Sequence, residues 1–338
     1  MSAGAQQVSM PWSPAPAQLT MAYSVCRGIT RASAKNFYYA FLVLPKRKRQ
    51  ALCAVYAFMR RCDDVADDSS LSLEARRLKL DTWLAALHRV QQGQPSDDPI
   101  LLALTDAQRK YTIPAGLLDE LATGTAMDVV EPELESPRFH GQGDHGQGNH
   151  GQGTPVSANP AVPAVTGLTV RYRTFDDLKV YCYGVASVVG RVCIHIFGYR
   201  DPAAEPLAEQ CGLAFQLTNI IRDVKEDAGM GRVYLPEEDL AKFGLSAAEL
   251  LAAPDAVRFR PVLALQAGRA REFYQAGEKL SAYISEDSQP ALWVLVNIYR
   301  KLLEKIAARQ YDVFGAKVSL TVGEKLRILG KGFLRRLT

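Results

Sequence analysis

The sequence lacks several features that would assign it to other classes of protein. None of its six cysteines forms a CxxC pair, and most lie in apolar helical contexts, which predicts buried, reduced thiols in a cytoplasmic protein. No apolar run reaches the ~18 residues of a membrane-spanning helix. The N-terminus lacks the basic region and apolar core of a secretory signal. The net charge of +4 is too small to predict nucleic-acid binding, but it suits an anionic substrate or peripheral contact with acidic lipid.

Hydrophobic periodicity predicts an all-α fold. Few segments alternate apolar and polar residues with a period of two, so we expect minimal sheet content. Residues 72–91 place apolar residues on one face and charged residues on the other, which is typical of an amphipathic helix. Residues 174–198 are nearly all apolar after a capping box of Thr174 and Asp177, which predicts a central, buried helix. Further helices are expected within residues 20–40 and over residues 45–64, 99–113, 114–130, 258–284, 289–310 and 321–336.

The domain organisation follows from composition. Residues 1–19 are rich in Pro, Ala and Ser and predict a disordered lead-in to a domain at 20–338. Residues 131–167 interrupt that domain with Gly, Gln, Pro and small residues, which cannot bury enough apolar surface to offset the entropy of ordering. The last predicted helix, 321–336, is basic and amphipathic, and it suits docking on the core or contact with a membrane surface.

The interruption contains a repeat, HGQGDHGQGNHGQG, that invites two other interpretations. A G-x-G-x-x-G match falls within it, but no predicted strand precedes the match and no helix follows, so the context rejects a dinucleotide site. The repeat also spaces His140, His145 and His150 five residues apart, where weak binding of a transition metal is a minor alternative to a disordered insertion.

The segment NIIRDVKEDAGMGRVYLP carries the strongest chemical signal. Asn219, Asp223 and Asp227 are spaced four apart, so a helix places all three side chains on one face. Their oxygens suit a hard cation such as Mg²⁺. Arg222 and Arg232 add guanidinium groups, and the combination suits a pyrophosphate held partly by metal and partly by arginine.

A second acidic cluster, in MRRCDDVADDSS, contains Asp63, Asp64, Asp67 and Asp68. A solvated helix face is the simplest alternative. The preceding run ALCAVYAFMRRC is largely apolar, however, so this helix is expected to be mostly buried. Negative charge near its C-terminal end opposes the helix macrodipole, and a bound cation would relieve the repulsion. The face shared with two of these aspartates also carries Tyr56 and Arg60.

These motifs resemble the squalene and phytoene synthase family of head-to-head prenyl transferases. The resemblance runs from about residue 22 to residue 320, apart from the insertion. It is carried by AVYAFMRRCDDVADD, YCYGVASVVG and QLTNIIRDVKEDAGMGRVYLP, in the family's order. The text NFYYAFLVLP looks closest to bacterial presqualene diphosphate synthases of hopanoid pathways.

The resemblance implies an isoprenoid synthase fold, a single helical domain around a deep apolar cavity. It implies two sets of Mg²⁺ ligands, with Mn²⁺ as an alternative ion, that bridge to diphosphate: Asp63 and Asp67 in the first, and Asn219, Asp223 and Asp227 in the second. It places Tyr181 in the first half-reaction. It also places around the diphosphates Tyr56, Arg60, Gln216, Arg222, Arg232 and Tyr234. Where relatives often have serines this chain has Ala34, Lys35 and Asn36, so Lys35 and Asn36 become candidate phosphate contacts, with ordinary capping and surface roles as the alternative.

The main functional expectation is Mg²⁺-dependent condensation of two farnesyl diphosphates to presqualene diphosphate. Continuation to squalene would require NADPH. The alternative in the same class is a phytoene synthase that condenses two geranylgeranyl diphosphates. An alternative of another class is a non-catalytic subunit of a prenyl-lipid pathway, which the intact aspartates disfavour.

Overall fold

The structure is a computed structural model that describes residues 12–34, 36–68, 70–127, 170–252 and 254–337. The predicted insertion at 131–167, Lys35 and most of the predicted lead-in lie outside the described residues.

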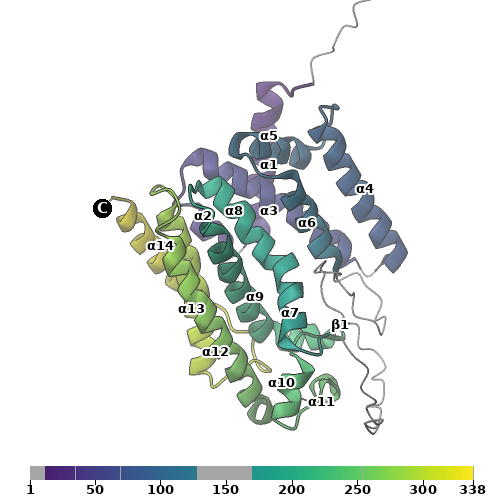
Figure 1. The fold of residues 1–338 in the computed structure, drawn as a ribbon, viewed down its shortest axis with the longest axis vertical. Coiled ribbons are helices and arrows are strands. Elements are labelled where there is room, and N and C mark those ends of the chain that lie inside the picture. Colours follow the sequence, from purple (N-terminus) through teal and green to yellow (C-terminus); the bar gives the residue numbers. More distant parts are fainter. Residues whose placement is uncertain (1–11, 35, 69, 128–169, 253, 338) are drawn as a thin grey trace, which may run out of the picture.

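The described residues form a single helical domain, which confirms the all-α prediction (Figure 1). The helices are α1 (Pro16–Ser33), α2 (Phe37–Phe41), α3 (Lys46–Ala66), α4 (Leu73–Gln91), α5 (Pro99–Tyr111), α6 (Ala115–Ala126), α7 (Phe175–Cys182), the π-helical η2 (Tyr183–Ser187), α8 (Val188–Phe197), α9 (Ala204–Gly229), α10 (Glu237–Lys242), α11 (Ala247–Ala252), α12 (Ala256–Leu280), α13 (Gln289–Ala308) and α14 (Val322–Leu337). Two short parallel strands, β1 (Val170–Arg171) and β2 (Arg232–Val233), form the one sheet among the described residues.

The first helix begins earlier than the sequence indicated. α1 starts at Pro16, whereas the domain was predicted to start at residue 20. Proline is favoured in a first helical turn because its fixed φ suits the helix and its missing N–H would be unsatisfied there. The Gln18 side-chain carbonyl accepts a hydrogen bond of 2.8 Å from the Ala15 N–H. The Pro-, Ala- and Ser-rich composition of residues 1–19 indicated disorder, so the sequence analysis missed this helix start.

α9 lies in the middle of the helical body, between α8 and α12 (Figure 1). Two glycines allow the helix of residues 175–197 to approach it closely. A Cβ at Gly190 would lie 2.5 Å from the Ala208 carbonyl oxygen, and one at Gly212 would lie 2.5 Å from that of Ala186. Real Cβ atoms do not approach a carbonyl oxygen so closely, so larger residues at either position would separate the helices. The close approach fixes α9, and with it the second acidic motif.

The helix of residues 175–197 differs from the sequence analysis in one respect. It was expected to be continuous and α-helical, but η2 interrupts it where Gly184 packs against Gly124 of α6. It also contains an 18-residue window with a mean hydropathy of 1.5, so by length and composition alone it could cross a membrane, although charged residues interrupt its apolar run. It contacts α9 and α6 in the body, and the predicted capping box of Thr174 and Asp177 begins it.

All six cysteines are free, and all but the half-buried Cys193 are buried. This agrees with the prediction of buried thiols. Cys62 lies one residue before Asp63 in α3, and Cys211 lies in α9.

Candidate active site

The first acidic motif lies at the end of α3, and an arginine that follows the second motif in the chain reaches it. Asp67 is the C-cap of α3, and α9 ends two residues after Asp227. Arg232 of β2 reaches across, and both of its terminal nitrogens lie 3.3 Å from Asp67 Oδ1. Segments separated by 165 residues in the chain are thereby joined.

The pairing of β1 with β2 holds Arg232 and the turn before it in place. Val170 pairs with Arg232 and Arg171 with Val233, in parallel register. The N–H of Glu237 continues the connection by donating to the Tyr172 carbonyl oxygen over 2.9 Å. The turn from α9 into β2 uses Gly231 at a φ of 75°, where a residue with a side chain would be strained.

Three tyrosines stack beside this turn. The ring centroids of Tyr181 and Tyr234 are 5.0 Å apart, those of Tyr172 and Tyr181 are 5.5 Å apart, and those of Tyr172 and Tyr234 are 6.1 Å apart. Tyr181 and Tyr234 are buried and Tyr172 is half-buried. The structure therefore brings together Tyr181 and Tyr234, which the resemblance placed in one site. It adds Tyr172, which the sequence analysis missed.

Asp223 lies between two cationic side chains. Arg222 Nε donates to Asp223 Oδ1 over 2.8 Å, and Lys317 Nζ lies 2.7 Å from the same oxygen. Burial raises the pKa of Asp223, but the hydrogen bonds and charges of Arg222 and Lys317 outweigh it and leave the pKa below its usual value. The carboxylate is thus ionised at neutral pH and already lies beside positive charge.

Asn219 presents an oxygen that suits a cation. Its Oδ1 is buried and has no hydrogen-bond partner among the residues that the structure describes. A buried acceptor without a partner costs free energy, which a ligand in contact with it would recover. The Asn219 amide nitrogen instead contacts Gln216 Oε1 at 3.4 Å. The unpartnered oxygen, one helical turn from Asp223, fits the hard-cation interpretation of this motif.

Tyr299 of α13 connects Asn219 to the N-terminal segment. The side-chain amides of Asn219 and Asn36 approach the hydroxyl oxygen of this buried tyrosine as hydrogen-bond donors, and its ring stacks on Phe215 with a centroid separation of 4.5 Å. Burial raises the pKa of Tyr299 to about 12, against the opposing charge of Arg222 and the two hydrogen bonds. Asn36 therefore reaches the second motif through a tyrosine.

The first motif is less tightly organised. Arg60 forms a partly exposed ion pair of 2.5 Å with Asp64, which is not one of the predicted metal ligands. Tyr56 is half-buried, and burial raises its pKa. Asp63 and Asp227 are half-buried. Within the described ranges, no group of three or more His, Cys, Asp or Glu side chains is already gathered as a metal site. The metal assignments therefore rest on helix spacing and on Asn219.

Tyr172, Tyr299 and Lys317 are the site residues that the sequence analysis missed. Each comes from a segment without a recognisable motif, so only tertiary contacts reveal it. A cavity of about 450 Å³ opens instead between α1 and α2, lined by Ser24, Arg27, Gly28, Arg31 and Tyr38. The deep apolar cavity implied by the resemblance stays a prediction.

Comparison with known proteins gives consistent results. A family model described as squalene/phytoene synthase matches residues 30–324. The chain is 32% identical over 337 residues to a 15-cis-phytoene synthase of Synechococcus elongatus, with 96% of each chain covered. It is 33% identical over 325 residues to a phytoene synthase of Mycobacterium tuberculosis, covering 95% of this chain and 93% of that one.

Solved structures with the same fold include synthases of the squalene type. A dehydrosqualene synthase in complex with a ligand superposes with a TM-score of 0.74 at 27% identity, covering 94% of this chain and 96% of that one. The squalene synthase HpnC from Alicyclobacillus acidocaldarius gives a TM-score of 0.69 at 25% identity, with coverage of 88% and 97%. These likenesses confirm the predicted isoprenoid synthase fold.

Proposed function

The chain belongs to the squalene/phytoene synthase family of prenyltransferases, and from this membership we propose that it condenses two geranylgeranyl diphosphates head to head into a C40 polyene of the phytoene type. The two relatives described above, matched over nearly their whole lengths at 32% and 33% identity, are phytoene synthases. They favour condensation of geranylgeranyl diphosphate over the condensation of farnesyl diphosphate that the sequence analysis expected. The wording of NFYYAFLVLP was too short a signal to distinguish the two.

The structural observation that carries the condensation chemistry is the contact between Arg232 and Asp67. It brings the segment that follows the second acidic motif to the first motif, so that one leaving diphosphate can contact groups from both segments. Arg222 and Lys317 flank Asp223 and supply further positive charge for that anion.

A divalent cation such as Mg²⁺, when bound, would neutralise the diphosphate and ease its departure. The residues that would hold it are Asp63, Asp67, Asn219, Asp223 and Asp227. Asn219 offers its unpartnered buried oxygen, and the aspartates offer carboxylates, which are the ligands that such an ion prefers.

The tyrosine stack suits the reaction that follows. Loss of diphosphate from an allylic carbon leaves a carbocation, which the double bond of the second substrate attacks. Loss of a proton then closes a cyclopropane. A second ionisation and a further proton loss give a polyene without a hydride donor. The π faces of Tyr172, Tyr181 and Tyr234 can stabilise positive charge, and the burial of Tyr181 and Tyr234 limits the water that would quench it.

Product analysis tests the proposal. The purified protein is incubated with Mg²⁺ and either geranylgeranyl or farnesyl diphosphate, with and without NADPH, and the products are identified by mass spectrometry. We expect a C40 hydrocarbon from geranylgeranyl diphosphate that does not depend on NADPH. A C30 product made only from farnesyl diphosphate would refute the chain-length assignment while leaving the family's chemistry intact.

The farnesyl reaction is the second candidate because the dehydrosqualene synthase shares the fold at 27% identity. A C30 cyclopropyl diphosphate that persists with NADPH would identify a presqualene diphosphate synthase, and squalene would identify a complete squalene synthase. A non-catalytic role predicts no turnover of either substrate. Loss of turnover in folded Asp63→Ala and Asp223→Ala proteins would exclude that role, whereas unchanged turnover would refute the metal assignment.

A further inference from the structure

The C-terminal helix α14 is held against the body along one face only. Its main contacts are with α13 and α2. Leu329 is 7% exposed, and a Cβ at Gly332 would lie 2.2 Å from Val294 Cγ2. The start of the helix is fixed by Glu324, which accepts hydrogen bonds from the Thr321 N–H and from Lys305 of α13. α14 is therefore a fixed part of the fold.

The outer face of α14 is apolar. Val322, Leu326, Phe333 and Leu334 are 62%, 51%, 40% and 64% exposed, and they make up four of the ten large exposed hydrophobic side chains among the described residues. At about 100° per residue, the first three fall within about 40° of one another on the helix, and Leu334 lies about 80° further round. We call these four residues the apolar stripe. Exposure of large apolar side chains to water is unfavourable, and four of them gathered on one helix mark an interaction surface.

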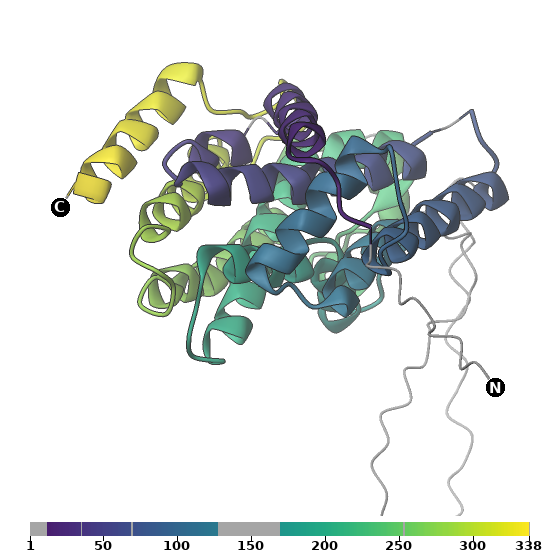
Figure 2. The same cartoon turned by 90° about the horizontal axis from the view of Figure 1, so that it is seen from above.

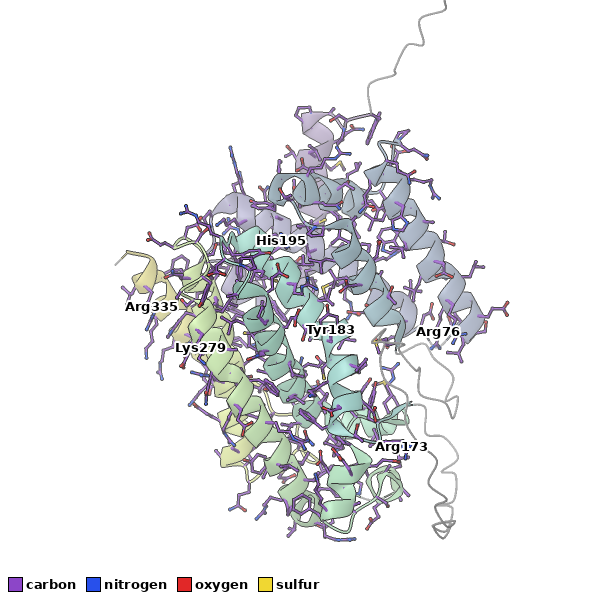
Figure 3. All side chains as sticks on the ribbon, in the orientation of Figure 1. Arg76, Arg173, Tyr183, His195, Lys279 and Arg335 are labelled. Carbon is purple, nitrogen blue, oxygen red and sulfur yellow. The ribbon has the colours of Figure 1, made fainter. Side chains whose placement is uncertain are left out.

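A row of basic residues borders the apolar stripe. Arg327, Lys331 and Arg335 are exposed and spaced four apart, so they follow one line along the helix beside Leu334. Arg335 also lies with its guanidinium 4.7 Å from the Trp293 ring centroid and is labelled at the outer edge of the molecule in Figure 3. α14 contains five basic residues and one acidic residue, and that residue, Glu324, is bound to Lys305.

We propose that α14 is a docking helix for an anionic lipid bilayer, lying in the plane of the interface with the apolar stripe in the acyl boundary and the basic row among the headgroups. An amphipathic helix with exposed apolar residues beside lysine and arginine binds such a surface. The same side of the molecule also carries α1, whose Arg27 and Arg31 line the open cavity described above (Figure 2).

Charge complementarity favours a lipid surface over a second copy of this chain. A two-fold contact through α14 would bring its basic row close to the same row of the partner, because an isologous interface uses the same patch twice. Like charges at such a contact repel, whereas each basic residue near an anionic membrane contributes about 1 kcal/mol, a factor on the order of five in affinity.

Co-sedimentation with lipid vesicles tests the proposal with the full-length protein and without any substrate, so that its outcome is independent of the reaction catalysed. Binding is measured to vesicles of phosphatidylcholine alone and of phosphatidylcholine with 30% phosphatidylglycerol, at low and high salt. We expect binding to the anionic vesicles that weakens with salt. Arg327→Gln with Lys331→Gln should reduce it on the order of tenfold or more.

Two matched leucines provide the control. Leu334→Ser on α14 removes a leucine that is 64% exposed, and Leu78→Ser removes one that is 66% exposed on α4, which lies on the opposite side of the molecule in Figure 1. We expect Leu334→Ser to weaken vesicle binding on the order of tenfold, and Leu78→Ser to leave it unchanged. Absence of binding to anionic vesicles, or equal loss in both variants, would overturn the proposal. A shift from dimer to monomer in Leu334→Ser, without a change in vesicle binding, would instead assign the stripe to a second copy.

Discussion

The hydroxyl of Tyr299 offers a sharp test of how the second acidic motif is oriented. Tyr299→Phe keeps the ring, which stacks on Phe215 and meets Phe37 edge-on, so the packing of α13 should survive. It removes the group that hydrogen-bonds to Asn219 and Asn36. At about 1 kcal/mol for each bond, the free energy of unfolding should fall by about 2 kcal/mol.

The functional effect should exceed this loss of stability. Without the hydroxyl, the Asn219 side chain can rotate away from its place one turn before Asp223. We expect the concentration of Mg²⁺ that gives half-maximal turnover to rise several-fold and kcat to fall about tenfold or more, since misplaced catalytic groups are costly. Turnover is measured across a Mg²⁺ titration at saturating substrate.

Tyr274→Phe is the control for this experiment. Tyr274 is also a buried tyrosine, and its hydroxyl lies 2.7 Å from Thr218 Oγ1, next to Asn219 in the chain. Thr218 keeps its bond to the Ala214 carbonyl oxygen, so this variant should lose only about 1 kcal/mol of stability. Its Mg²⁺ dependence should match that of the parent protein. If both variants shift the Mg²⁺ titration equally, or neither does, Tyr299 has only a packing role.

Three further predictions follow from the packing, the charges and the metal. Gly124→Ala should destabilise the protein by about 2–3 kcal/mol, because its Cβ would lie 2.2 Å from the Gly184 carbonyl oxygen. Gly116→Ala in the same helix is the control: its Cβ would meet nothing within 4 Å, so the substitution should be neutral. Equal urea midpoints for the two variants would contradict the close approach. Asp223→Asn should lower stability by about 2 kcal/mol at pH 7. Because the native pKa of Asp223 is lowered, its carboxylate contributes to the free energy of unfolding above about pH 3.9, and this contribution is lost as the pH falls from there through the native pKa. The free energies of unfolding of Asp223→Asn and of the parent protein should therefore converge in acid. A constant difference between them down to pH 2 would refute the ion pair. Chelation by EDTA should abolish turnover, added Mg²⁺ should restore it, and the circular dichroism should not change; full activity in EDTA would refute the metal site.

The sequence predicted well what depends on local periodicity. The helices α4, α5 and α13 begin and end within about two residues of their predicted bounds, since apolar stripes and capping residues are local signals. The spacing of Asn219, Asp223 and Asp227 placed them on one helix, and α9 confirms that helix.

Contacts between segments far apart in the chain could not be predicted from local periodicity. The pairing of β1 with β2 joins two dipeptides, too short for any strand pattern. Lys317 reaches Asp223 from the connection between α13 and α14, where nothing in the local sequence marks it. The π-helical turn η2 contains Gly184, which packs against Gly124 of α6, and a contact with a neighbouring helix leaves no periodic signal in the sequence.

The buried cysteines provide built-in reporters of local opening. Burial raises the pKa of Cys62 and of Cys211 to about 12, so at pH 8 on the order of one thiol in ten thousand is the reactive thiolate. A thiol reagent can therefore modify them at an appreciable rate only when α3 or α9 opens. The labelling rates of the two cysteines would report separately on the helices that carry the two acidic motifs, without any introduced dye or mutation.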